Sequence, residues 1–285
     1  GNHNTASGYG ALYLNTTGAR NTAYGQASLY TNTTASNNTA CGGYALYLNT
    51  TGTNNTASGD YALYSNTTGA YNTASGHHAL YSNTTSSHNV AVGSLALFVN
   101  TTGTQNTASG YRALYSNTTA SDNTAVGLKA LDANTTGGYN TAIGVATLLK
   151  NTTGTHNTAS GQAVLYYNTT GGTNTATGHY ALHNNTTASD NTAVGQRALF
   201  TNTTGYENAA CGQNALGNST TGFCNTACGR AAGHTTTTGN YNLLLGYAAI
   251  TSSATAGGEV VLGDSNVSTL RCNTSTISSL SDARD

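Results

Sequence analysis

A 17-residue unit that recurs without a single insertion or deletion constrains this chain more than any other feature. The unit reads N-T-A-x-G-x-x-A-L-Y-x-N-T-T-G-x-x, and Glu259 replaces its first Asn in a sixteenth, degenerate copy. A fixed repeat length indicates that every copy makes the same contacts with its neighbours, as in solenoid proteins. The other fifteen copies begin at Asn4, Asn21, Asn38, Asn55, Asn72, Asn89, Asn106, Asn123, Asn140, Asn157, Asn174, Asn191, Asn208, Asn225 and Asn242.

Three positions of the unit describe its interior. The third is Ala from Ala6 to Ala227 and the ninth is Leu from Leu12 to Leu216, so we expect a narrow core of Ala and Leu. The fifth is Gly in every copy, which predicts a positive φ or a close approach of two backbones at each turn. These glycines are Gly8, Gly25, Gly42, Gly59, Gly76, Gly93, Gly110, Gly127, Gly144, Gly161, Gly178, Gly195, Gly212, Gly229, Gly246 and Gly263.

Two short segments of each unit, T-A-x and A-L-Y-x, are predicted to be strands separated by Gly- and Asn-rich turns. A helix is excluded because the Gly, the two Asn and the β-branched Thr residues all disfavour helix. The unit therefore predicts an all-β fold, a parallel β-solenoid or β-roll of sixteen 17-residue coils. Each coil would add its strands beside those of the coil before, with a rise of ~4.8 Å.

The tenth position is usually aromatic, as at Tyr13 and Phe98. So thin a roll has little room for these rings, and if they face outward they form an apolar stripe along the rod, which normally marks an association surface. Association around a threefold axis would bury the stripe, so we predict a homotrimer. The last copies become more apolar, at Leu243–Leu245 and Val260–Leu262, which predicts a cap or a subunit junction.

The N-T-A-x-G-x-x-A-L unit, with its fixed Gly and small inward residues, resembles the head repeats of trimeric autotransporter adhesins. This resemblance implies left-handed parallel β-rolls assembled as trimers. The usual unit of that family is a few residues shorter and favours N-x-V-A-I-G strings. The strings N-L-L-L-G at 242–246 and E-V-V-L-G at 259–263 come nearer to that pattern than the earlier copies do.

Residues 277–284 read I-S-S-L-S-D-A-R and resemble the junction before the intramolecular chaperone of endosialidase-type phage tail spikes and fibres. The resemblance implies a chaperone that trimerises the fibre and is then released by self-cleavage between Ser281 and Asp282. It makes residues 1–263 the repeat shaft and residues 264–285 a connector. It also implies a phage-type tail fibre that mediates host-surface adhesion, with an extracellular location on a virion or a cell surface.

Charge and composition exclude other classes of function. Charged residues make up 6% of the chain, the formal net charge is -1, and the basic residues are scattered, so we expect no nucleic-acid partner. No apolar run approaches the ~18 residues of a membrane span, so we expect no membrane insertion. We also expect no enzyme beyond the self-cleavage, because there is no G-x-S-x-G motif and the acidic residues are isolated. The acidic residues weighed for this are Asp60, Asp122, Asp132, Asp190 and Glu207.

Histidines and cysteines give no strong metal signal. His77 and His78 could meet symmetry mates at a threefold axis and bind a metal, but the sixth and seventh positions vary so much that exposed side chains are the simpler interpretation. We therefore predict no metal site and no cofactor. The five cysteines match no metal-ligand spacing beyond a loose C-x3-C at Cys224 and Cys228. We favour their interpretation as small packing residues over a disulfide.

The N-T-T segment fits the N-x-[ST] glycosylation sequon in twelve copies. A densely glycosylated rod would follow if the protein were secreted by a eukaryotic pathway. Asn and Thr stacked at a solenoid corner would instead form hydrogen-bonding ladders, which is the interpretation that we favour. The sequon residues are Asn15, Asn32, Asn49, Asn66, Asn83, Asn100, Asn117, Asn134, Asn151, Asn168, Asn185 and Asn202.

Recognition of a host-surface glycan or receptor is predicted at the variable sixth, seventh, sixteenth and seventeenth positions. Two alternatives stay open: a bacterial trimeric adhesin head, and a secreted ice-binding or glycosylated filament. Ice binding is disfavoured because adjacent Thr pairs alternate in direction and leave one Thr per coil on a face. The residues at the variable positions include Tyr9, His77, His78, Tyr111, Arg112, Lys129, Tyr139, Arg197 and Glu207.

Overall fold

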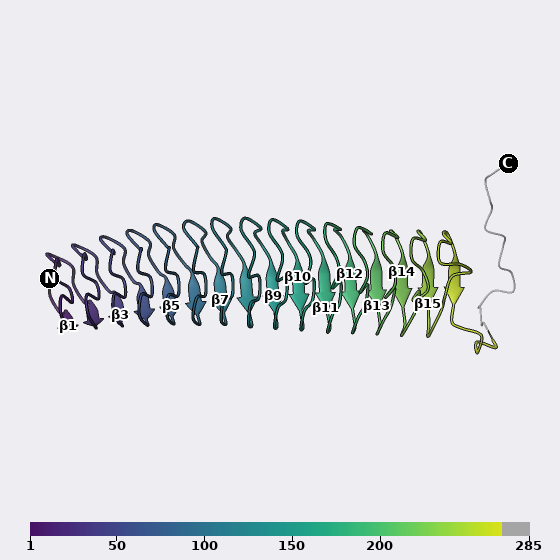
Figure 1. The fold of residues 1–285 in the computed structure, drawn as a ribbon, viewed down its shortest axis with the longest axis horizontal. Helices are drawn as coiled ribbons and strands as arrows, with labels where there is room; N and C mark the ends of the chain where they lie inside the picture. Colours follow the sequence, from purple (N-terminus) through teal and green to yellow (C-terminus); the bar gives the residue numbers. More distant parts are fainter. Residues whose placement is uncertain (270–285) are drawn as a thin grey trace.

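The computed structural model describes residues 1–269 as a rod of stacked coils, with the strands in one row along one side (Figure 1). Sixteen strands form one parallel sheet in chain order, and each residue pairs with the residue 17 positions later, as Ala40 does with Ala57. The predicted all-β parallel solenoid is confirmed. The strands are β1 (Thr5–Ser7), β2 (Thr22–Tyr24), β3 (Thr39–Cys41), β4 (Thr56–Ser58), β5 (Thr73–Ser75), β6 (Val90–Val92), β7 (Thr107–Ser109), β8 (Thr124–Val126), β9 (Thr141–Ile143), β10 (Thr158–Ser160), β11 (Thr175–Thr177), β12 (Thr192–Val194), β13 (Ala209–Cys211), β14 (Thr226–Cys228), β15 (Leu243–Leu245) and β16 (Val260–Leu262).

The second predicted strand, A-L-Y-x, is wrong. This segment is a series of turns in which the ninth residue, Leu, has a positive φ, for example 52° at Leu46. Its amides still bond from coil to coil, since the Leu46 N–H donates to the Ala62 carbonyl at 3.0 Å. A 17-residue coil must turn through a full circle around a core that is one side chain wide. Residues in the left-handed backbone conformation supply the bends that an extended strand lacks.

The invariant Gly at the fifth position is required for two reasons. At Gly127 φ is 133°, and a Cβ placed there would lie 2.4 Å from the carbonyl oxygen of Gly144 in the next coil. Any other residue would be strained in this conformation and would also collide with the neighbouring backbone. This contact recurs from coil to coil, which explains why the glycine column is unbroken.

The core consists of two columns, Ala at the third position and Leu at the ninth. Both are fully buried through most of the rod, as at Ala91 and Leu97. Burying a Leu side chain contributes about 2 kcal/mol, so one Leu per coil supplies much of the hydrophobic stabilisation. The predicted narrow Ala and Leu interior is confirmed.

Two buried columns of Asn line the corners of the coil. In the first, the Asn38 backbone N–H donates to the Asn21 side-chain oxygen at 3.0 Å, and Asn38 Nδ2 donates to the Gly52 carbonyl at 2.9 Å. In the second, Asn49 Nδ2 donates to Asn32 Oδ1 at 3.0 Å and again to the Gly52 carbonyl, at 2.9 Å. Each amide therefore links its coil to its neighbours and satisfies a buried turn, which is the ladder that the sequence predicted.

In the apolar C-terminal repeats, the large and small core residues partly exchange places between the two columns. Gly233 takes the place of the ninth-position Leu, and a Cβ on it would lie 2.7 Å from side-chain carbons of both Leu216 and Leu244. Leu244 stands where earlier repeats have the small Ala, and it is fully buried. The interior volume is thus kept by moving the Leu from one column to the other. The sixteenth repeat contributes the strand β16, and fifteen full 17-residue steps separate Thr5 from Val260.

Candidate interaction surfaces

The outer face of the sheet carries no charged side chain on any of its sixteen strands. The middle residue of each strand faces the core, so the second and fourth positions of the repeat face outward, and they hold mostly Thr, Ser, Val and Cys. The face becomes more apolar toward its C-terminal end, where Val260 and Leu262 are 61% and 44% exposed. We call this surface the sheet face.

A second surface is the aromatic column at the tenth position. Its rings stack from Tyr13 to Tyr115, with successive centroids 5.1–5.3 Å apart. A shorter stack at the seventh position, Tyr44, Tyr61 and His78, lies beside it. The rings lie outside the Ala and Leu core, but from Tyr30 onward each ring is half-buried between its neighbours, so this column exposes less apolar surface than an outward-facing stripe would.

The aromatic column is interrupted at Asp132, which forms an ion pair with Arg112. Arg112 Nε and Nη2 donate to the two carboxylate oxygens at 2.8 and 3.0 Å, and the guanidinium lies 4.2 Å from the Tyr115 ring centroid. The hydrogen bond that Arg112 donates to the Asp132 carboxylate raises the pKa of Arg112. It is the one ion pair found among residues 1–269, so the charge of Arg112 is already compensated.

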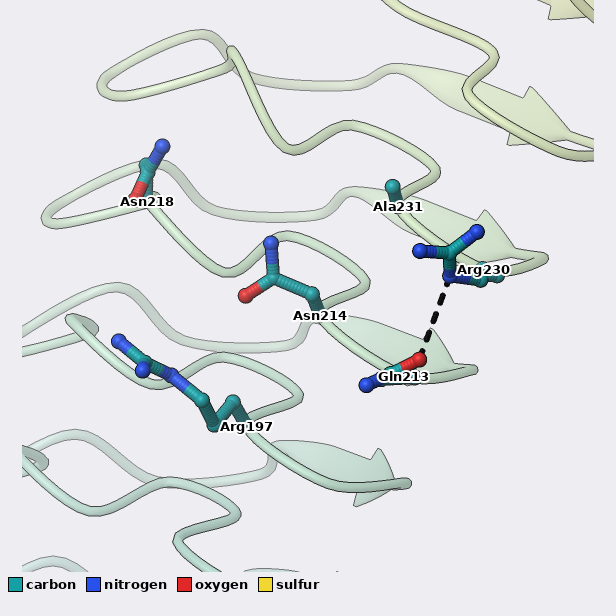
Figure 2. Close-up of a pocket in the computed structure, with 6 residues that line it drawn as sticks. All are labelled: Arg197, Gln213, Asn214, Asn218, Arg230 and Ala231. Carbon is teal, nitrogen blue, oxygen red and sulfur yellow. Dashed lines mark hydrogen bonds between the residues drawn. The ribbon is translucent and has the colours of Figure 1, made fainter.

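Two adjoining hollows lie farther along the rod, over the ninth to fourteenth repeats. One, of about 510 Å³, is lined by Tyr166, Tyr180, His183 and Phe200 together with Gln162 and small residues, and it ends at Arg197. The other, of about 390 Å³, begins at Arg197 and reaches Arg230. Figure 2 shows this second hollow, with Arg197, Asn214 and Ala231 on successive coils and Arg230 beside Gln213. No carboxylate lines either hollow.

Comparison with known proteins adds no family. A scan against protein-family models found no match, and a search of curated proteins found no relative. These surfaces are therefore interpreted from their own chemistry.

The predicted recognition positions do not all lie together. The hollows are lined by the sixth and seventh positions, two of the four at which the sequence predicts recognition, but also by the tenth and eleventh, as at Phe200 and Asn218. The sixteenth and seventeenth positions, which include Tyr139 and Glu207, lie at the other end of the strand and line neither hollow. The missed signal was the break in the aromatic column at both ends of this region: Asp132 and Leu149 hold the tenth position before Tyr166, and Gly217 holds it after Phe200.

The acidic residues are less isolated than the sequence suggested. Asp190 and Glu207 occupy the seventeenth position of successive coils, so their Cα atoms lie about 4.8 Å apart at the usual strand spacing. Asp190 accepts a hydrogen bond from Thr173, and Glu207 accepts one from the Cys224 thiol at 3.1 Å, which raises the pKa of that thiol. These carboxylates are exposed and lie outside both hollows.

His77 and His78 lie side by side with their Nδ1 atoms 3.0 Å apart. Burial and the neighbouring His77 lower the pKa of His78. Within residues 1–269 no three His, Cys, Asp or Glu side chains come together as a metal site would require.

The four cysteines of the described residues do not pack in the interior. Cys41, Cys211 and Cys228 are exposed on the sheet face, and the latter two are register partners on β13 and β14. Cys224 is partly exposed and lies beside Glu207. The fourth position faces outward on every strand, so the interpretation of Cys41, Cys211 and Cys228 as small packing residues is wrong.

The sequon asparagines from Asn32 onward are fully buried. Their Nδ2 atoms, to which a glycan would be attached, donate to a neighbouring Asn and to the next turn, as described for Asn49. A glycan in the folded coil would break both bonds. Ser281, Asp282 and Cys272 lie outside the described residues. In the described part, no helix is long and apolar enough to cross a membrane.

Proposed function

We propose that this chain is the shaft of a homotrimeric attachment fibre of the phage tail-fibre type, located outside the cell, in which the three sheet faces meet around the axis. The observation that carries the proposal is the uncharged sheet face, which runs the full length of the rod while the charged residues lie on other positions of the repeat. Depletion of charge is typical of the core of a protein interface.

The size of the sheet face fits a stable assembly. Three residues span about 10 Å and sixteen strands at ~4.8 Å span on the order of 75 Å, so each chain offers on the order of 750 Å². That is close to the ~800 Å² that each partner contributes to a standard interface. A single chain would leave this surface in water, including the C-terminal Val and Leu residues. Association of the sheet faces stabilises them, whereas the aromatic column is already half-covered by its own stacking.

A rod of equal coils suits an attachment fibre. Each coil contacts only its neighbours, so repeats can be added without a new core, and stability grows with the number of coil–coil contacts. The same reasoning applies to a bacterial trimeric adhesin head. The sequence that follows Asp285 separates the two: a globular chaperone favours the fibre, and a heptad-repeat stalk favours the adhesin.

One observation favours a second candidate, an ice-binding filament. The second position of the repeat places an exposed or half-exposed Thr on most strands of the sheet face, a regular array that the N-T-T pairs alone did not predict. The fourth position is irregular, with Tyr24, Cys41 and Ile143 among its members, which weakens the array. Thermal hysteresis from a monomeric rod would support this candidate over the fibre.

The test of the fibre is the mass of the native full-length protein. We expect three chains for the wild type. Ser58→Glu with Thr177→Glu places charges on the sheet face and should dissociate the trimer. The control, Thr68→Glu with Thr187→Glu, places them at exposed corner residues and should leave the trimer intact. A monomeric wild type, or equal dissociation by both double variants, would contradict the proposal.

A further inference from the structure

The two hollows adjoin at Arg197 and form one groove with two chemically different ends. The sheet face, on which the proposed trimer rests, lies elsewhere on the repeat. We call the groove the arginine groove and define it by Tyr166, Tyr180, His183, Arg197, Phe200 and Arg230. Arg197 lines both hollows and so connects the aromatic end to the polar end. All its residues come from the sixth, seventh, tenth and eleventh positions of the repeat, none of which lies on the sheet face.

The groove exists because the side-chain columns are interrupted. In the second to seventh repeats the tenth position is always aromatic, and large residues such as Tyr61 fill most of the seventh. In the ninth and tenth repeats the seventh position holds only Ala146 and Ala163, and in the thirteenth repeat Gly217 replaces the tenth-position ring. The backbone continues unchanged through these coils, so each missing side chain leaves space at the surface.

The rings at one end meet at a steep angle. His183 stacks on Phe200 with an interplanar angle of 8°, whereas Tyr180 is turned 85° from His183 and 77° from Phe200. Together the three rings make an aromatic corner at this end of the groove. The side of a sugar ring that carries its C–H bonds is apolar, and it packs well on aromatic side chains.

The other end of the groove is cationic and rich in amides. Arg197 and Arg230 are exposed and have no carboxylate partner within residues 1–269, and Gln213, Asn214 and Asn218 lie between them. Arg197 lies 4.3 Å from the Phe200 ring centroid, which holds the guanidinium over the junction of the two hollows. A planar guanidinium binds carboxylate or sulfate oxygens in pairs, and side-chain amides bind hydroxyls.

We propose that the arginine groove binds a linear anionic saccharide, with a pyranose ring on the aromatic corner and a carboxylate or sulfate on Arg197 and Arg230. This inference deepens the proposed attachment function by naming the receptor chemistry, and as a receptor site it rests on that function. The binding itself needs only one chain, because every residue of the groove belongs to the same rod.

The experiment is a titration of the full-length protein with three soluble probes: a hyaluronan hexasaccharide, a sulfated maltohexaose and neutral maltohexaose. We expect the carboxylated or the sulfated probe to bind, and to bind more weakly as salt rises. The stronger of the two identifies the anion. Failure of both anionic probes to bind more tightly than maltohexaose would overturn the proposal.

Variants decide whether the groove is the site. Arg197→Gln and Arg230→Gln should each weaken binding at least about tenfold, since each removes charge-assisted hydrogen bonds. The matched control is Arg112→Gln, because Arg112 has the same repeat position and the same stacking on a ring as Arg197 but is neutralised by Asp132. An equal loss in Arg112→Gln would mean general attraction to charge and would overturn the proposal.

The mass of the same samples separates the two proposals. Binding by a monomeric protein would refute the trimer and leave the groove standing. A trimer that binds none of the anionic probes would refute the groove and leave the fibre standing. Circular dichroism of each variant checks that the coils are intact.

Discussion

The second to seventh repeats and the ninth to fourteenth repeats share one backbone but present different surfaces. In the first region the rings stack without a gap from Tyr30 to Tyr115, and its one arginine at the seventh position, Arg112, is paired with Asp132. In the second region the columns are broken, and Arg197 and Arg230 have no ion-pair partner in the described part of the chain. The difference teaches that the inner positions of the repeat specify the coil, while small substitutions at outer positions create a site without cost to the fold.

Truncating a core side chain should lower the folding stability of both regions equally, and this should be the largest effect. Leu63→Ala and Leu182→Ala each remove a fully buried side chain from an identical column, so we expect a loss of about 3 kcal/mol in either region. Hydrogen exchange of amides in the same coils measures the loss locally. A difference of more than about 1 kcal/mol between the two variants would show that the interiors are not equivalent.

Breaking the Asn ladder should cause the second-largest loss of stability. Asn66→Ala and Asn185→Ala each remove an Nδ2 that donates to a neighbouring Asn and to a turn carbonyl, and leave those acceptors buried. We expect each variant to lose about 2 kcal/mol of folding stability, because buried polar groups without a hydrogen-bond partner are costly. Substitution of the exposed Thr68 by Ala is the control and should change the exchange rates little. Equal rates in all three variants would refute the structural role of the ladder.

Removing a surface ring should separate the two regions. Tyr64 contacts three rings, stacked on Tyr47 and Tyr81 at 5.3 and 5.1 Å and tilted against Tyr61, whereas Phe200 contacts two, stacked on His183 and edge-on to Tyr180. Each aromatic pair contributes about 1 kcal/mol beyond its buried area, so Tyr64→Ala should destabilise its coils more than Phe200→Ala does. Phe200→Ala should instead weaken saccharide binding. The reverse order of stabilities would contradict the contrast between the continuous and the interrupted column.

Releasing Arg112 should have a small effect on stability. The ion-pairing side chains are 32% and 16% exposed, so Asp132→Asn should cost at most about 1 kcal/mol. It should give the first region an uncompensated arginine that lines neither of the two hollows. We expect weak, salt-sensitive binding of the anionic probes there, measured in an Arg197→Gln background. Binding as tight as that of the wild type would show that the hollow is dispensable.

The smallest expected effect is on pH dependence. Burial and His77 lower the pKa of folded His78 below its ordinary value of 6.5, so the unfolded chain takes up a proton more readily than the folded chain. The stability contributed by neutral His78 is therefore complete above about pH 6.5 and is lost as the pH falls through the folded pKa. His78→Tyr should remove this dependence and extend the ring stack. Hydrogen exchange of the fifth repeat at pH 5 and pH 8 measures it, and an unchanged dependence in the variant would assign it to another group.

The sequence was sufficient for the fold because a constant repeat length leaves few ways to bury an Ala and a Leu from every unit. It was insufficient for the second strand, because Leu has no preference for the left-handed conformation that it adopts at Leu46. A signal of the left-handed conformation was present where Gly replaces the usual residue. Gly10, Gly233 and Gly258 occur at the seventh, ninth and seventeenth positions, and each of these positions has a positive φ. The groove was harder to predict, because it depends on side chains that are missing from columns rather than on a motif.

The most direct test of the account is a density map of the native full-length fibre in cross-section. We predict three coils around one axis, with the sheet faces inward and the arginine groove facing solvent. Successive coils should superpose after a rise of ~4.8 Å along the axis. A single rod, or three rods whose sheet faces point outward to solvent, would contradict the proposed assembly.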